Sequence, residues 1–180
     1  NTNYHVSLGN TKSVYIDETN AASTSYDYWN DTTPTSSVFT VKDDGSYDEV
    51  NAASDQTFIA YLWSGKQGFS KFGSYTGNGN ADGAFIYTGF KPAMVIQKVS
   101  STTGSWHIHD NKRSINGTDK YLYPDTNEAE VSTTRMDFLS NGFKLRSDSS
   151  TWNGSGATFV YAAFAEAPFV NSNGVPCNAR

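Results

Sequence analysis

The feature that most constrains the fold of this chain is a series of short apolar runs separated by turn-forming sequences. The runs either alternate apolar and polar residues or are continuously apolar, as strands are, and none shows helical periodicity. They lie at Ser13–Asp17, Val38–Lys42, Thr57–Trp63, Ser70–Tyr75, Ala84–Thr88, Ala93–Val99, Trp106–Asp110, Tyr121–Tyr123, Met136–Leu139, Phe143–Arg146 and Thr158–Ala163. Residues that favour turns, such as those of Ser140–Gly142, stand between them. This spacing predicts an all-β fold, an antiparallel β-sandwich or jelly roll.

Two of the runs, Phe58–Trp63 and Phe159–Phe164, are apolar at almost every position. Strands of this composition are usually covered on both faces, because a solvated face would carry polar residues. We therefore expect both segments to be central strands of a sheet.

The chain also contains an internal repeat, because four blocks recur in the same order between 101 and 108 positions further along. The pairs are Lys12–Asp17 with Lys120–Asp125, Phe39–Lys42 with Phe143–Arg146, Asn51 with Asn153, and Thr57–Ile59 with Thr158–Val160. This order predicts the duplication of one β unit. We expect an incomplete first copy over residues 1–72, a complete second copy over 73–170 and a tail over 171–180, in one compact globule.

The first copy has no counterpart of the strands expected within Ala84–Val99. A copy without these strands should present an unpaired sheet edge. We expect the second copy, another subunit or upstream residues to cover that edge. The chain begins at Asn1 with neither an initiator methionine nor a signal segment, so we also expect a processed product or a piece of a longer chain.

The charge and composition of the chain argue against two classes of partner. Its 13 basic and 18 acidic residues give a net charge of −5 and form no basic stripe, so we expect no nucleic-acid partner. No run approaches the ~20 consecutive apolar residues of a membrane span, so we expect no membrane insertion. The single cysteine, Cys177, cannot form an internal disulfide or a Cys-based zinc cluster.

The segment Trp106–Asp110 holds the most distinctive polar pattern. His107 and His109 should point to the same face of a strand, because side chains alternate along it. Two imidazoles at this spacing, with a carboxylate, could ligate a metal, but no third ligand group is identifiable. The alternative, which we favour, is an exposed polar face of an edge strand, with Trp106 and Ile108 facing the core.

Asn78, Asn80 and Asp82 stand in a spacing that resembles the front half of a calcium-binding loop. The twelfth position of such a loop, where a carboxylate is expected, is Gly89. A tight turn explains the same residues. Calcium is therefore a weak candidate, and we expect neither a cofactor nor a metal.

The chain carries no motif of a known catalytic class. It contains no nucleophile elbow, phosphate loop or dinucleotide fingerprint, so we expect a protein that is not an enzyme. Aromatic faces could form a platform for sugar rings, although a tryptophan in a sandwich is more often buried. The candidate ligand-binding residues are Trp106, His107, His109, Asp110, Lys112, Arg113 and Trp152.

Several segments resemble a signature of tail-fibre-like virion proteins from marine and cyanobacterial phages. They are Phe69–Gly83, Tyr87–Ala93, Asp137–Arg146, Tyr161–Phe169 and the ending Asn173–Arg180. In that group, this domain occurs in tandem copies near the C-terminus and has no characterised function. Members often carry Tyr-x-Tyr where this chain has His107-Ile-His109, which argues against a metal role there.

The resemblance implies a virion protein on the particle surface, in particular a tail-fibre or adhesin domain that contacts the host cell. A host surface glycan is then the candidate ligand, with binding expected at Trp106–Arg113 and Asn78–Gly83. A fibre location also implies a homo-oligomer, commonly a trimer, with other virion proteins as partners. The alternatives are a capsid or tail decoration protein with no host ligand, and a carbohydrate-binding module or depolymerase.

Overall fold

The computed structural model of the chain describes residues 1–24, 27–42, 50–51, 57–113 and 120–166. Their regular structure is almost entirely β, as the sequence predicts. The elements are β1 (Thr2–Asn3), β2 (Val14–Tyr15), β3 (Ser70–Thr76), β4 (Phe85–Tyr87), β5 (Pro92–Val99), β6 (Trp106–Asp110), β7 (Lys120–Leu122), β8 (Val131–Ser132), β9 (Met136–Leu139), β10 (Gly142–Leu145), α1 (Ser150–Asn153) and β11 (Thr158–Ala165). Over these described ranges, no helix has the length and hydrophobicity that a bilayer crossing requires.

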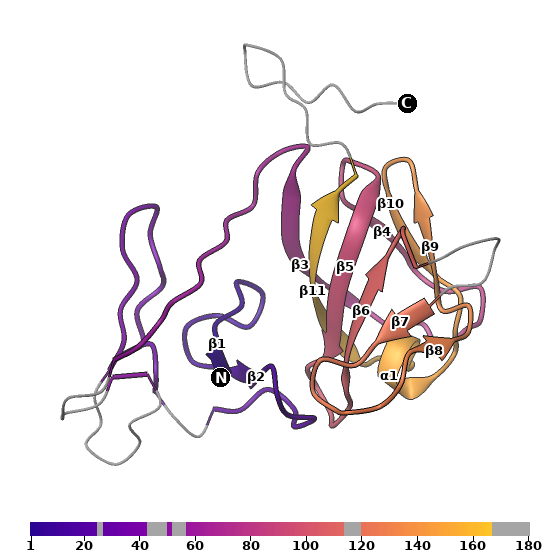
Figure 1. The fold of residues 1–180 in the computed structure, drawn as a ribbon. Helices are drawn as coiled ribbons and strands as arrows, with labels where there is room; N and C mark the ends of the chain where they lie inside the picture. The colour runs from indigo at the N-terminus through magenta and orange to yellow at the C-terminus, as the bar shows by residue number, and fades with distance from the viewer. Residues whose placement is uncertain (25–26, 43–49, 52–56, 114–119, 167–180) are drawn as a thin grey trace, which may run out of the picture.

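The strands form a sandwich of two antiparallel sheets, with the short β1–β2 pair beside it (Figure 1). The larger sheet has six strands in the order β3-β11-β5-β6-β7-β8, and the smaller has three in the order β4-β10-β9. All the pairings are antiparallel. The predicted all-β, antiparallel sandwich is thus confirmed.

The core lies between the two sheets and is rich in aromatic side chains. The register places Tyr161 opposite Gln97, and Gln97 opposite His107, so these three side chains share one face of the larger sheet. Phe143 of β10 packs edge-on against Tyr161, with ring centroids 5.3 Å apart. The buried cluster consists of Tyr75, Ile86, Phe90, Val95, Val99, Tyr121, Met136, Phe143, Leu145, Trp152, Phe159, Tyr161 and Ala163.

The N-terminal segment, residues 1–24, lies against the opposite face of the larger sheet. Trp106 Nε1 donates a hydrogen bond to the carbonyl oxygen of Tyr15 at 2.7 Å. The buried Lys98 Nζ donates to the carbonyl oxygens of Glu18 at 3.3 Å and Gly104 at 2.5 Å. Because Trp106 and Lys98 are paired in the register one position away from the core face, this segment adds a third layer over part of the sheet.

The prediction of a central strand at Phe58–Trp63 is wrong. This stretch forms no strand, and its large side chains are exposed, from 46% for Phe58 to 81% for Ile59. Its counterpart in the repeat, Phe159–Phe164, lies in β11 between β3 and β5, as predicted. A central strand needs a hydrogen-bonded strand on each of its two edges, and no described strand pairs with Phe58–Trp63.

Val38–Lys42 likewise forms no strand, although Phe143–Arg146, which matches Phe39–Lys42 in the repeat, contributes most of β10. The predicted strands of the second half agree with the structure within a few residues, and Trp106–Asp110 agrees at both ends. The duplication itself stays a prediction. Cys177 and the tail over 171–180 lie outside the described residues.

Candidate binding cleft

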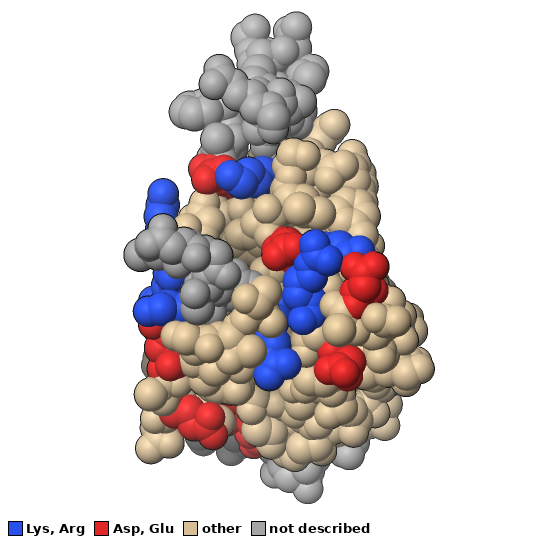
Figure 2. All heavy atoms as spheres, turned by 90° about the vertical axis from the view of Figure 1, so that its right-hand side faces the viewer, with Lys and Arg blue, Asp and Glu red and all other residues tan. Residues whose placement is uncertain are grey.

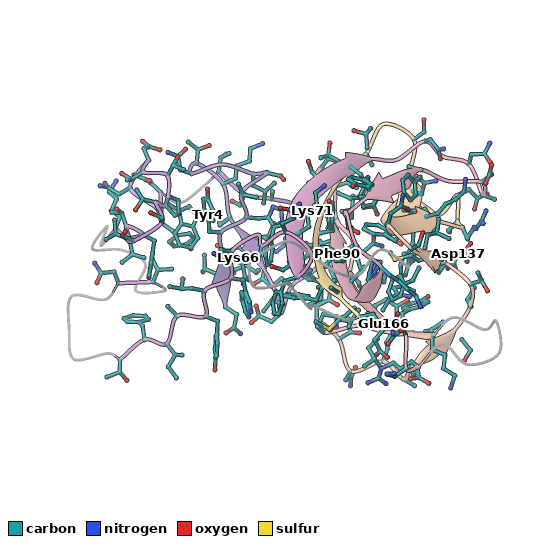
Figure 3. All side chains as sticks on the ribbon, turned by 90° about the horizontal axis from the view of Figure 1, so that it is seen from above. Tyr4, Lys66, Lys71, Phe90, Asp137 and Glu166 are labelled. Atoms are coloured by element: carbon teal, nitrogen blue, oxygen red, sulfur yellow. The ribbon has the colours of Figure 1, made fainter. Side chains whose placement is uncertain are left out.

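A cleft of about 360 Å³ opens where strand ends of the larger sheet meet β9 of the smaller sheet. It is lined by Lys91, His109, Asn111, Met136, Asp137, Phe138 and Leu139. Lys91 directly precedes β5 and Asn111 directly follows β6, so the larger sheet supplies a polar wall. Strand β9 supplies the facing wall, which is largely apolar. Seen from above, Asp137 lies on the far side of the sandwich from Tyr4 of the N-terminal segment (Figure 3).

His109 forms the floor of the cleft, because it lines the cleft although only 2% of it is exposed. Its Nε2 has no hydrogen-bond partner within the described part of the chain. Burial lowers the pKa of His109 to about 3, against the opposing effect of the Asp110 carboxylate. The imidazole is therefore neutral near neutral pH, and its Nε2 can either donate or accept one hydrogen bond.

The expected placement of the two histidines on an exposed edge is wrong. His107 and His109 are 1% and 2% exposed, and β6 lies between β5 and β7 rather than at an edge. Both rings pack against Trp152, with centroids 3.9 and 4.9 Å from it. Burial, and then the charges of His109, Lys98 and Arg135, lower the pKa of His107 to about 3. Burying a neutral imidazole among aromatic rings costs far less free energy than burying a charged one. The face of β6 that carries the two histidines is therefore its core face.

The rim of the cleft is held by charged contacts. Lys91 Nζ lies 2.7 Å from Glu166 Oε2, and Asn111 Nδ2 donates to Glu166 Oε1 at 2.8 Å. The hydrogen bond from Lys91 is the main cause that lowers the pKa of Glu166. On the other wall, Arg146 Nε donates to Asp137 Oδ2 at 2.5 Å. Basic and acidic side chains lie next to each other on the face seen in Figure 2, which gives this side a mixed charge pattern.

The remaining polar candidates after β6 have structural contacts. Asp110 Oδ1 accepts hydrogen bonds from the backbone N–H groups of Lys112 and Arg113 at 2.9 and 2.8 Å. Arg113 Nε lies 2.7 Å from Asp110 Oδ2, and its Nη1 lies 2.9 Å from Glu130 Oε2. Asp110 and Arg113 thus stabilise the turn that follows the strand. Lys112 is exposed beside the cleft.

Neither candidate tryptophan is presented to solvent. Trp152 is 1% exposed in the core, and Trp106 is 8% exposed beneath the N-terminal segment. This burial favours packing over ligand binding at both positions, because a platform for a sugar ring must expose one face of the aromatic ring.

The calcium candidates form a self-bonded loop. Asn78 Oδ1 accepts from the Asn80 backbone N–H at 3.0 Å, and Asn80 Oδ1 accepts from that of Asp82 at 2.9 Å. The Asp82 carboxylate lies within ion-pair distance of Lys144 and Arg146. These oxygens act as acceptors in turns and ion pairs, which supports the interpretation of a tight turn. Across the described ranges, no group of three or more His, Cys, Asp or Glu side chains is placed to hold a metal.

Sequence reasoning missed most of the cleft. Of its lining residues, His109 is a named sequence candidate and Asn111 lies within the expected binding segment Trp106–Arg113. Lys91, Asn111 and Asp137 carry no motif, and they come together only because β9 packs across from the ends of β5 and β6. The one signal in the sequence was the position of Asn111 directly after a well-predicted strand.

The fold and the cleft thus define an all-β domain with a recess of ligand size. The chain belongs to the family described as a domain of unknown function, DUF7483, whose model matches residues 2–168. No curated protein matches the chain, and no solved structure matches it.

Proposed function

We propose that this domain belongs to the surface of a phage particle, as part of a tail fibre or adhesin, and binds a glycan of the host cell surface. The resemblance of Phe69–Gly83 and Asp137–Arg146 to tail-fibre-like virion proteins supports the location. A rigid antiparallel sandwich is a suitable scaffold, because it keeps a recess in place at an exposed end.

The observation that carries the proposal is the composition of the cleft. Its volume of about 360 Å³ falls at the lower end of the range of small-molecule sites, which suits one or two sugar rings. Lys91, Asn111 and Asp137 offer donors and acceptors for hydroxyl groups, while Phe138 and Leu139 offer an apolar wall for the C–H face of a ring. His109 lies at the floor as a neutral side chain, so the cleft carries no buried charge there.

Single-site affinity in such a recess would be weak, since it is small and open to solvent. A fibre that displays several copies overcomes this through avidity, because the second attachment on the same cell is effectively intramolecular. This is consistent with a homo-oligomer, such as a trimer, in contact with other virion proteins.

A decoration protein with no host ligand is the second candidate function. The exposed apolar side chains of Phe58–Trp63 favour it, because such rows commonly mark protein–protein contacts. A carbohydrate-binding module outside a virion would use the same cleft and would differ only in its setting.

The test is binding of the labelled chain to an array of bacterial surface glycans and to host cells. The Lys91→Ala/Asn111→Ala variant removes two polar groups of the rim, and we expect at least a tenfold loss of binding, which corresponds to about 1.4 kcal/mol. Lys42→Ala is the matched control, because Lys42 Nζ lies 2.8 Å from Asp27 in a similarly exposed ion pair away from the cleft.

If the control binds like the unmodified chain and the cleft variant does not, the adhesin function is supported. If the unmodified chain binds no glycan and no host cell, the decoration function replaces it. If the cleft variant binds unchanged, the glycan site lies elsewhere on the domain.

A further inference from the structure

The chain enters β3 through a closed hairpin turn. Lys66 N–H donates to the carbonyl oxygen of Ser70 at 3.0 Å, and Ser70 N–H donates back to that of Lys66 at 2.9 Å. Ser70 Oγ also donates to the carbonyl oxygen of Ser64 at 2.8 Å. Gly68 has a φ of +70°, which the turn requires and glycine adopts without strain. This geometry is the first rung of an antiparallel β ladder.

Before that turn, the chain does not continue the ladder. The segment Thr57–Trp63, here called the arm, separates from β3 and runs away from the sheet (Figure 1). Its backbone is nevertheless extended, because the rings of Tyr61 and Trp63 stack with centroids 6.1 Å apart, as side chains two positions apart on a strand do. The arm is therefore a strand in shape that has no partner strand among the described residues.

The arm is the most apolar exposed stretch of the described chain. Ile59, Tyr61, Leu62 and Trp63 are 81%, 74%, 71% and 65% exposed. Exposed apolar side chains at successive positions of an extended segment favour addition to a sheet, which buries both its side chains and its backbone groups.

Strand β3 offers the complementary surface. It is the terminal strand of the six-stranded sheet, and its inner edge pairs with β11 from Ser70 to Thr76. No other described strand pairs with its outer edge. The arm and β3 are each seven residues long, about 23 Å when extended, so the arm is long enough to pair with several residues of this edge.

The internal repeat indicates which kind of strand the arm pairs with. The arm, Thr57–Trp63, corresponds to Thr158–Phe164 of β11, the strand that forms the ladder with the inner edge of β3. The sequence pattern that β11 uses for this pairing is thus present a second time in the chain, and among the described strands only β11 pairs with β3.

We propose that the arm of one chain pairs with the outer edge of β3 in a second copy of the chain, so that copies associate by exchanging this strand. Within one chain the arm diverges from its own β3 at Ser64. The N-terminal segment, for its part, is held on the sheet through the carbonyl oxygens of Tyr15 and Glu18. A second copy supplies what the arm and the edge each lack, because each chain has one arm and one edge of β3 that pairs with no other described strand. Such exchange closes as a dimer or as a ring of three.

The pairing of Lys66 with Ser70 lies within one chain, and we take the exchanged ladder to repeat its register, which places residues 60–63 of the arm opposite residues 73–76 of β3. If the pairing of Lys66 with Ser70 continues, Leu62 faces Ser74 across the two strands. Facing residues on antiparallel strands are close enough for a disulfide. We therefore test the Leu62→Cys/Ser74→Cys variant in a Cys177→Ser background, under mild oxidation, on a non-reducing gel. The matched control is Phe58→Cys/Ser74→Cys, which the same register keeps apart.

The expected result is a disulfide-linked dimer or trimer for the in-register pair and monomer for the control. A disulfide within one chain would overturn the proposal, because it would show that the arm closes on its own β3. The absence of any disulfide in the in-register pair would also overturn it.

A second measurement does not depend on a disulfide. We expect the mass of the unmodified chain by light scattering to be two or three times 19.7 kDa, and that of Ile59→Asp/Leu62→Asp to be that of the monomer. The control Val6→Asp/Val38→Asp replaces two apolar residues outside the arm that are also largely exposed, at 59% and 63%, and should keep the oligomer. A monomeric unmodified chain, or an oligomer that survives charges in the arm, would contradict the exchange.

Discussion

At the scale of single residues, the most consequential feature is a pair of imidazoles in the core. His107 and His109 are neutral in the folded state because their surroundings lower both pKa values to about 3. In the unfolded chain each would have a pKa near 6.5. The unfolded state therefore binds more protons than the folded state between these values, and stability falls as the pH is lowered.

We expect the free energy of unfolding to decrease by about 2 kcal/mol for each histidine between about pH 7 and pH 5. Urea unfolding at several pH values measures this. The paired carboxylates of Asp82, Glu130 and Glu166 have lowered pKa values, so they titrate at lower pH and do not produce this slope. A His107→Gln/His109→Gln variant should lose most of it, and an unchanged slope would refute the assignment.

A second prediction concerns Asn153, which is fully buried. Its Oδ1 accepts from the Asn78 backbone N–H at 2.9 Å, and its Nδ2 lies 2.8 and 3.0 Å from the carbonyl oxygens of Asn80 and Ser147. Asn153→Ala leaves these groups without partners, so we expect a loss of about 3 kcal/mol in thermal or urea unfolding. The exposed Asn141→Ala should change stability by less than about 0.5 kcal/mol. Equal effects of the two would contradict this role.

At the scale of elements, the joining of β4 to β10 depends on one glycine. A Cβ at Gly142 would overlap the carbonyl oxygen of Ile86 on the facing strand. We expect Gly142→Ala to separate these strands and lower the melting temperature by several degrees, since overpacking typically costs about 1–3 kcal/mol. Gly65→Ala is the control, because its Cβ would meet only an ordinary contact at 3.9 Å. A melting temperature as high as that of the control would show that β4 shifts freely.

The elements also show what a single sequence can predict. The alternation of side-chain types predicted both ends of β6, because the two-residue period of a strand is visible in neighbouring residues alone. The alternation did not predict which face of β6 meets the core. The two histidines were expected to face water, but here they are neutral rings that pack in the core. The arm has the pattern of a central strand, yet pattern alone cannot say whether partner strands exist. The cleft could not be predicted, because Lys91, Asn111 and Asp137 meet only when two sheets pack.

At the scale of the whole molecule, Lys98 joins the N-terminal segment to the sandwich. Burial lowers its pKa to about 8, although Asp125 and Glu18 act in the opposite direction. Lys98→Met removes the donor to the Glu18 and Gly104 carbonyl oxygens. We expect hydrogen exchange of the Ala22 and Gly104 amides, which bond across this contact, to become about tenfold faster, or roughly 1.4 kcal/mol.

Lys112→Met is the control for that measurement, because Lys112 is exposed and lies away from the N-terminal segment. If both variants left the two amides equally protected, the docking of the segment would rest on other contacts, such as the Trp106–Tyr15 hydrogen bond.

The central claim is that the cleft between the sheets binds a host glycan, and the ring of His109, which lines the cleft, reports on binding through the change in its surroundings. The measurement is the imidazole ¹⁵N spectrum during titration with oligosaccharides from the surface polysaccharide of the host. We predict that the His109 Nε2 resonance shifts in a saturable way, while that of His107, which is buried but does not line the cleft, stays in place. Saturable binding with both resonances unchanged would place the glycan elsewhere and contradict the account.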